Sequence, residues 1–218
     1  MEKLMKWVEE KLVPPMAKIG TQRHLLAIRN GVVSTLSLIL IGTFFMVFIN
    51  LPFPGWNEFI APYSATIVLP FRITMGLMAI YATFVMGSDL AKSYGLDSVT
   101  GGILSLGTFF MLQVPVNVLT TEEAPIGCVL TMSSLGASGM FAGILSMIFA
   151  VEVYRFFKKR NITIKMPEQV PPAVARSFEA FIPGAVILTT TWLIRSVAGF
   201  DVNAALLSLF EPLTNILG

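Results

Sequence analysis

The side chains best able to do chemistry are scarce in this chain of 218 residues, which has one histidine and one cysteine. His24 lies between Arg23 and Arg29 with no acidic residue near it in sequence to orient it. We therefore interpret it as a surface or packed residue, not as a catalytic or phosphorylated one. Cys128 falls in an apolar segment that we predict to be helical. A thiol there lacks the electropositive, partly exposed setting that makes a cysteine reactive, so we interpret it as a packing residue.

The known catalytic motifs are missing from the sequence, which contains no P-loop, no GxSxG turn, no zinc signature and no nucleotide fingerprint. One cysteine also allows neither an intrachain disulfide nor a cysteine cluster around a metal. We therefore predict no autonomous catalysis, no cofactor, no metal site and no nucleic-acid partner.

Arg72 is a charge within an otherwise apolar stretch, and such residues are candidates for a functional role in membrane proteins. We place it inside the first turns of a predicted membrane span, close to the outer edge. It could pair with Glu122 or Glu123, or contact a polar solute. The alternative is an arginine that extends its charge to the interface and marks the edge of the span.

Two amides form a second candidate, because Gln113 and Asn117 lie one helical turn apart if the segment is a helix. They could bond a sugar hydroxyl. They could instead bond backbone groups freed by Pro115, which lies between them and predicts a kink. Arg72, Gln113 and Asn117 are the weak candidates for contact with a substrate.

Small side chains recur at helical spacing in one apolar segment, and small residues let helix backbones approach closely in a membrane. We predict a helix-packing role for five of them, two of which form a GxxxG pair: Ser134, Ser138, Gly139, Ala142 and Gly143. The partner helix could belong to the same chain or to a second subunit. A close-packed ligand groove is the alternative.

The elements that must position these residues follow from the charges, which leave five long blocks free of Asp, Glu, Lys and Arg. Charged residues make up 13% of the chain, against about 25% in soluble domains. A helix needs about 20 apolar residues to cross a bilayer. We predict an all-α integral membrane protein with about five transmembrane helices, over residues 30–50, 66–88, 99–119, 126–151 and 179–199.

The two ends of the chain have amphipathic patterns. Residues 2–13 predict a helix on the membrane surface, stopped by two prolines, and residues 201–218 predict a surface helix on the outer side. We divide the chain into a cytoplasmic lead-in over 1–29, a five-span region over 30–200 and the outer helix over 201–218.

The basic residues orient the spans, because cytoplasmic loops carry an excess of Lys and Arg. Thirteen of the 15 fall on the side of the N-terminus, which we therefore predict to be cytoplasmic. The basic run over 155–160 could bind anionic lipid or a partner, and it also anchors the topology.

Three segments resemble a known family. Residues 166–184 (MPEQVPPAVARSFEAFIPG) are similar to the cytoplasmic loop of the lactose/cellobiose-type EIIC permeases of the bacterial sugar phosphotransferase system. Residues 18–45, with KIGTQRHLLAIRNG at their start, look like the first span of that family and its lead-in. Residues 90–106 look like the entry to its third span.

The resemblance implies a permease in the bacterial inner membrane that carries a β-linked disaccharide such as cellobiose, chitobiose or lactose. A partner IIB protein, supplied by IIA, would phosphorylate the sugar on the cytoplasmic face. Family members are homodimers of roughly twice this length. Their N-terminal half mainly builds the dimer interface, and their sugar-binding His and Glu lie in the C-terminal half. No sugar-site residue therefore transfers to this sequence.

Our main hypothesis is the N-terminal, dimerisation and scaffold half of such a permease, as a truncated, split or separately expressed domain. Alone it would insert into the membrane, contact lipid and form a dimer, without supporting sugar uptake. Two alternatives remain: a small secondary transporter or channel that works as an oligomer, and a structural membrane subunit.

Overall fold

The protein is described by a computed structural model that covers residues 2–7, 11, 13–14, 20–113, 116–119, 125–167, 169–206 and 208. Helices dominate it, and their α-helical segments are Glu2–Trp7 (α1), Arg23–Ser34 (α3), Leu36–Ile49 (α4), Trp56–Ile60 (α5), Ser64–Ile67 (α6), Leu69–Thr74 (α7), Met78–Ser93 (α8), Ser98–Gln113 (α9), Met140–Lys159 (α10), Pro172–Glu179 (α11) and Phe181–Trp192 (α12). Short 3-10 turns join several of them, and a π-helical turn, Leu193–Val197, continues α12.

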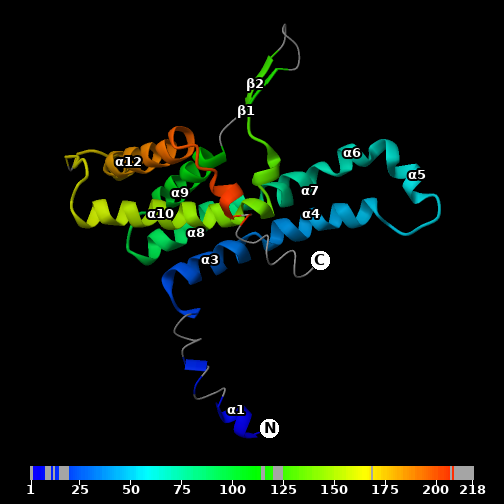
Figure 1. Ribbon diagram of the computed structural model, residues 1–218, viewed down its shortest axis with the longest axis horizontal. Helices are drawn as coiled ribbons and strands as arrows, with labels where there is room; N and C mark the ends of the chain where they lie inside the picture. The colour runs from blue at the N-terminus through cyan, green and yellow to red at the C-terminus, as the bar shows by residue number, and fades with distance from the viewer. Residues whose placement is uncertain are drawn as a thin grey trace.

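The helices form two regions (Figure 1). The first, called here the bundle, consists of α3, α8, α9, α10 and α12, which pack side by side. The second, called here the arm, consists of α4 and the returning segments α5, α6 and α7, and it extends away from the bundle. Helix α4 continues the direction of α3 after a break at Thr35, whose backbone N–H and hydroxyl both donate to the Val32 carbonyl.

The hydrophobic core lies in the bundle. One cluster of fully buried side chains joins α3, α8 and α10 around Met86, Leu90 and Met147. Two further clusters centre on Phe109 and on Tyr154. Helices α8 and α9 cross so closely that a Cβ on Gly101 would lie 2.3 Å from the Ala91 Cβ. Small residues therefore set the distance between these two helices, as expected for helices that associate in a membrane.

The predicted all-α class is confirmed, and so is the general pattern of spans. Three helical stretches are long and apolar enough to cross a membrane, over Arg23–Ile49, Trp56–Ser93 and Ala137–Lys159. Ser98–Gln113 and Phe181–Val197 are shorter apolar helices. The first two stretches begin earlier than predicted. Pro62 and Pro70 each lie in the first turn of a short helix. A backbone N–H at that position has no partner within the helix, so the missing N–H of proline costs nothing and the helical path continues.

The predicted helices over 99–119 and 126–151 are wrong where they approach each other. Helix α9 ends at Gln113, and the chain then forms an antiparallel hairpin of β1, Val116–Leu119, and β2, Pro125–Val129. Cys128 therefore lies in a strand and not in an apolar helix. Two 3-10 turns, Met132–Ser134 and Ala137–Gly139, follow before α10 begins at Met140.

The predicted surface helices are seen only in part. Helix α1 covers Glu2–Trp7 of the segment expected over 2–13. At the other end, residues 202–206 are helical, and 209–218 lie outside the described residues. The division into segments 1–29, 30–200 and 201–218 stays a prediction, although α3 already begins at Arg23.

Candidate functional site

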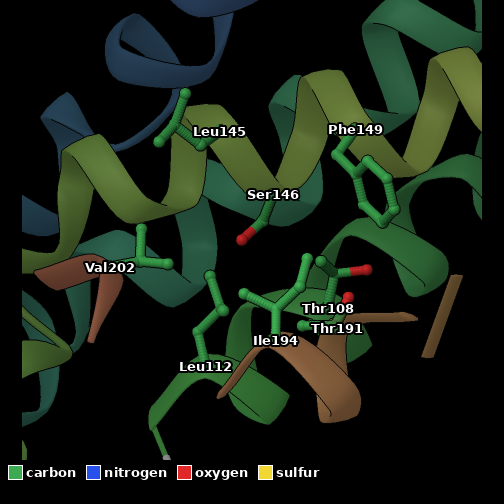
Figure 2. A pocket seen from close by; sticks show the side chains of 8 residues that line it. All are labelled: Thr108, Leu112, Leu145, Ser146, Phe149, Thr191, Ile194 and Val202. Carbon is green, nitrogen blue, oxygen red and sulfur yellow. The ribbon is translucent and has the colours of Figure 1, made fainter. Parts of the chain in front are cut away.

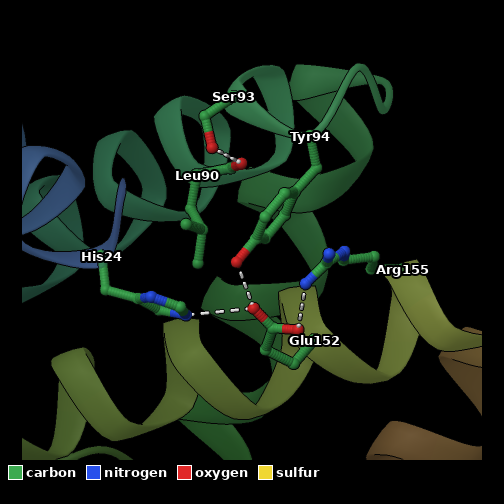
Figure 3. A network of polar contacts seen from close by, with 6 residues as sticks. All are labelled: His24, Leu90, Ser93, Tyr94, Glu152 and Arg155. Atoms are coloured by element: carbon green, nitrogen blue, oxygen red, sulfur yellow. Dashed lines mark hydrogen bonds and ion pairs between the residues drawn. The ribbon is translucent and has the colours of Figure 1, made fainter. Parts of the chain in front are cut away.

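A cluster of polar side chains joins three elements at one end of the bundle (Figure 3). Glu152 of α10 accepts hydrogen bonds from two sides: its Oε1 lies 3.0 Å from His24 Nε2 of α3 and 2.5 Å from the Tyr94 hydroxyl at the end of α8. Its Oε2 lies 3.1 Å from Arg155 Nη1, one turn further along α10. The Arg155 guanidinium also lies 3.9 Å from the centre of the Tyr94 ring. One carboxylate thus connects α3, α8 and α10.

The turn after α8 places Tyr94 in this cluster. Gly95 has a φ of 70°, a conformation that favours glycine, and its N–H donates to the Lys92 carbonyl. The N–H of Leu96 donates to the Ala91 carbonyl, which completes a Schellman motif at the end of the helix. Burial, and then the hydrogen bond to Glu152, raise the pKa of the Tyr94 hydroxyl, so it remains a donor at neutral pH.

Two ion pairs hold α11 against the same end of the bundle. Asp97 caps α9, since its Oδ1 accepts from the Thr100 backbone N–H at 2.8 Å, and its Oδ2 lies 3.3 Å from Arg176 Nε of α11. Glu179 of α11 pairs with Lys158 of α10. The hydrogen bonds from Thr100 hold the pKa of the Asp97 carboxyl below its usual value. This end of the molecule is therefore cross-linked by charges, while its core is apolar.

A cavity of about 130 Å³ lies between α9, α10 and the end of α12 (Figure 2). Three hydroxyls face this region, from Thr108, Ser146 and Thr191. Each donates to the carbonyl four residues earlier in its own helix. The remaining lining is aliphatic or aromatic, including Leu112 and Phe149. The cavity suits an apolar occupant, because a sugar would find no free hydroxyl hydrogen in it.

The polar cluster is suited to holding α3, α8 and α10 together and not to catalysis. Its one imidazole faces a carboxylate, and the serine drawn beside them in Figure 3, Ser93, donates its hydroxyl to the Leu90 carbonyl and not to the pair. Among the residues that the structure describes, no three His, Cys, Asp or Glu side chains come together as a metal site.

Comparison with known proteins decides the family. The family model described as "Phosphotransferase system, EIIC" matches residues 29–217. The chain belongs to the EIIC family of the phosphotransferase system. The resemblance seen in the three sequence segments is thereby confirmed, and the chain is placed in a family of membrane transporters.

The relatives of this EIIC chain include two curated permeases. It is 36% identical to the lichenan permease IIC component of Bacillus subtilis, over 90% of this chain and 46% of that protein. It is 34% identical to the cellobiose-specific EIIC component of Geobacillus stearothermophilus, again over 90% and 46%. The chain spans about half the length of the curated relatives it matches.

A solved structure shares the fold. The transporter ChbC, the IIC component of the N,N'-diacetylchitobiose-specific phosphotransferase system, superimposes with a TM-score of 0.84 at 34% sequence identity. The match covers 97% of this chain and 52% of that one.

The three residues predicted to contact a substrate do not come together. Arg72 is exposed on α7 in the arm, and its suggested partners Glu122 and Glu123 lie outside the described residues. Gln113 ends α9, and its Oε1 accepts from Asn203 Nδ2 at 3.1 Å. Asn117 lies in β1, so the two amides are not one helical turn apart, and its side chain is outside the described residues.

The small residues predicted for helix packing divide between two structures. Ser134, Ser138 and Gly139 lie in the 3-10 turns before α10, so they do not share a helical ridge with the other two. The GxxxG pair therefore does not lie within one helix, because Gly139 is the N-cap of α10.

Ala142 and Gly143 lie in α10 and are buried within the chain. A Cβ on Gly143 would lie 2.2 Å from the Thr83 hydroxyl of α8, so this contact is made inside one protomer. Gly139 is constrained by its own turn, since its Cβ would lie 2.0 Å from the Ser134 carbonyl oxygen.

The sequence interpretation missed the acidic partner of His24, because Glu152 lies 128 residues away. One signal for it existed. Glu152 follows the last residue of the predicted span over 126–151, and the observed helix α10 continues to Lys159. Read as an acidic residue within a membrane helix, it would have been a candidate for pairing with a cation.

Proposed function

We propose that this EIIC chain forms the N-terminal scaffold of a permease that carries a β-linked disaccharide into the cell. The observation that supports this most is the superposition of nearly the whole chain on ChbC, together with relatives named for lichenan and cellobiose. The sugars in the names of these proteins are all β-linked. The proposed substrate class is the β-linked disaccharides, which include cellobiose, chitobiose and lactose.

The geometry agrees with a scaffold role. The polar cluster around Glu152 uses its charges to join helices, and the cavity beside Ser146 has an apolar lining. The Glu152 carboxylate already accepts from Tyr94 and Arg155, and the three hydroxyls of the cavity already donate within their own helices. The sugar site therefore belongs to the remaining part of the permease, and phosphoryl transfer to partner IIB and IIA proteins.

The proposed orientation puts the polar cluster and α11 on the cytoplasmic side. Basic residues gather at that end of the bundle, among them Arg155, Lys158 and Lys159 at the end of α10. A IIB partner would approach this face, and two copies of the chain would associate within the bilayer. Cysteines introduced by Arg160→Cys and, separately, Phe59→Cys in a Cys128→Ser background should react with an impermeant maleimide from opposite sides of the membrane.

Uptake tests the main proposal. The chain replaces the matching residues of the lichenan permease in a strain that lacks its own β-glucoside permeases, and radiolabelled cellobiose and diacetylchitobiose are supplied. We expect the chimera to restore uptake that depends on IIB, and the chain alone to insert without uptake. Uptake by the chain alone would contradict the scaffold role. A chimera that inserts in normal amount but transports neither sugar would contradict the substrate class.

A further inference from the structure

A groove of about 430 Å³ lies in the arm, between the end of α4 and segments α6 and α7. Its walls combine aliphatic residues with three polar ones, and the aliphatic part includes Ile49 and Val68. The polar residues are Asn50, Ser64 and Arg72. It lies far in sequence and in space from the Glu152 cluster, at the other end of the α3–α4 path.

The polar groups of the groove are engaged within the chain, except for the arginine. Asn50 Nδ2 donates to the Met46 carbonyl at 2.8 Å, and the Ser64 hydroxyl donates to the Ala61 carbonyl at 2.8 Å. Within the described ranges, neither a hydrogen bond nor an ion pair engages the Arg72 guanidinium, whereas Arg155, Arg176 and Arg195 each have an acidic partner. As far as the described part of the chain goes, the groove thus holds a cation whose five N–H donors are free for a ligand.

The surroundings of Arg72 are those of a membrane interface. It belongs to the candidate span Trp56–Ser93, where an unpaired charge is costly. Exposed aromatic residues lie on the neighbouring segments, including Phe59 and Tyr63. Trp56 donates its indole N–H to the Phe48 carbonyl, which fixes it beside the stretch of α4 that lines the groove. Aromatic residues of this kind concentrate at the level of lipid headgroups.

We propose that this groove binds the phosphate of an anionic phospholipid, with Arg72 as the phosphate ligand and the aliphatic wall in contact with the upper acyl chain. A guanidinium can bond two phosphate oxygens at once, which an ammonium cannot do in the same planar geometry. The inference is independent of the sugar that the permease carries.

Trp56 offers a reporter for the test. In a variant with Trp7→Phe and Trp192→Phe, the full chain is reconstituted into phosphatidylcholine vesicles that contain either brominated phosphatidylglycerol or the same fraction of brominated phosphatidylcholine. We expect stronger quenching of Trp56 by the anionic lipid. Arg72→Gln should lower this preference about five-fold, which corresponds to ~1 kcal/mol for one basic residue near a charged lipid. Arg72→Lys should retain part of it.

The controls separate this site from other sources of quenching. Arg160→Gln removes an exposed arginine at the opposite end and should leave the preference unchanged. Glu122→Gln with Glu123→Gln should also leave the preference unchanged; a gain would show that one of these carboxylates, and not a lipid, neutralises Arg72. Equal quenching by the two brominated lipids would overturn the proposal. An undiminished preference in Arg72→Gln protein that inserts and elutes like the parent would also overturn it. If Arg72→Gln protein does not insert normally, the preference of Arg72→Lys protein is compared with that of the parent instead.

Discussion

The bundle and the arm are both built from apolar sequence, but they bury it differently. Leu90 in α8 is fully buried, whereas Leu40 in α4 is 71% exposed. Helix α4 has one buried residue, Gly42, among its 14 positions. The bundle is stabilised by its own core and by charge pairs at one end, while the arm leaves its apolar face to lipid or to another protein surface. Hydropathy alone therefore predicts which segments enter a membrane, but not which of them pack together.

The largest expected difference between the regions comes from a matched pair of leucines. Leu90→Ala should lower the free energy of unfolding by about 3 kcal/mol, because it leaves a cavity in a packed core. Leu40→Ala should change it by less than about 0.5 kcal/mol, since its side chain contacts the surrounding amphiphile in either state. Unfolding by SDS in mixed micelles, followed by tryptophan fluorescence, measures both. Equal losses would mean that the arm is as tightly packed as the bundle.

The close crossing of α8 and α9 gives the next effect. Gly101→Ala should destabilise the protein by about 2 kcal/mol relative to Gly107→Ala, through overpacking. The two changes carry the same gain in helix propensity and lie on the same helix. They differ in what the new Cβ meets: the Ala91 Cβ at 2.3 Å from position 101, but only Leu188 Cδ2 at 3.4 Å from position 107. The same SDS titration tests this, and a destabilised Gly107→Ala variant would contradict it.

The charged end of the bundle predicts a smaller loss. Glu152→Gln should cost about 1 kcal/mol, because the carboxylate accepts from Tyr94 and Arg155 but is partly exposed to solvent. Glu58→Gln, an exposed change in the arm, should be neutral. Thermal unfolding of detergent-solubilised protein compares the two variants. If Glu58→Gln cost as much as Glu152→Gln, the cluster in Figure 3 would have no bracing role.

The smallest expected effect is a pH dependence at the same end. The pKa of Asp97 is lowered in the folded protein, chiefly by the Thr100 hydroxyl, so its contribution to stability is present above the usual carboxyl pKa and is lost as the pH falls through the lowered value. Asp97→Asn should reduce the slope of unfolding temperature against pH in the acid range. Thr100→Val should move the loss to higher pH, and an unchanged slope in Asp97→Asn would refute the assignment.

The sequence predicted the membrane class and the family because both rest on local signals: charge-free blocks of sufficient length and a short loop motif. It missed the β hairpin and predicted helices there, because residues 124–151 are uncharged throughout and an apolar run alone does not distinguish strand from helix. A weak signal was present, since Val116 and Val118 alternate with other residues directly after Pro115.

The polar cluster could be predicted less well than the spans. His24 and Glu152 are brought together only by the packing of α3 against α8 and of α8 against α10, which no local pattern specifies. The interpretation of Arg72 as an interfacial charge stays a prediction, and it rests only on the position of one residue in one predicted span.

The break between α3 and α4 at Thr35 is closed by hydrogen bonds within the chain. The backbone N–H and the hydroxyl of Thr35 both donate to the Val32 carbonyl, and the residue is buried, so neither donor is left for water. A change in the angle between α3 and α4 would therefore disturb two hydrogen bonds at a buried position.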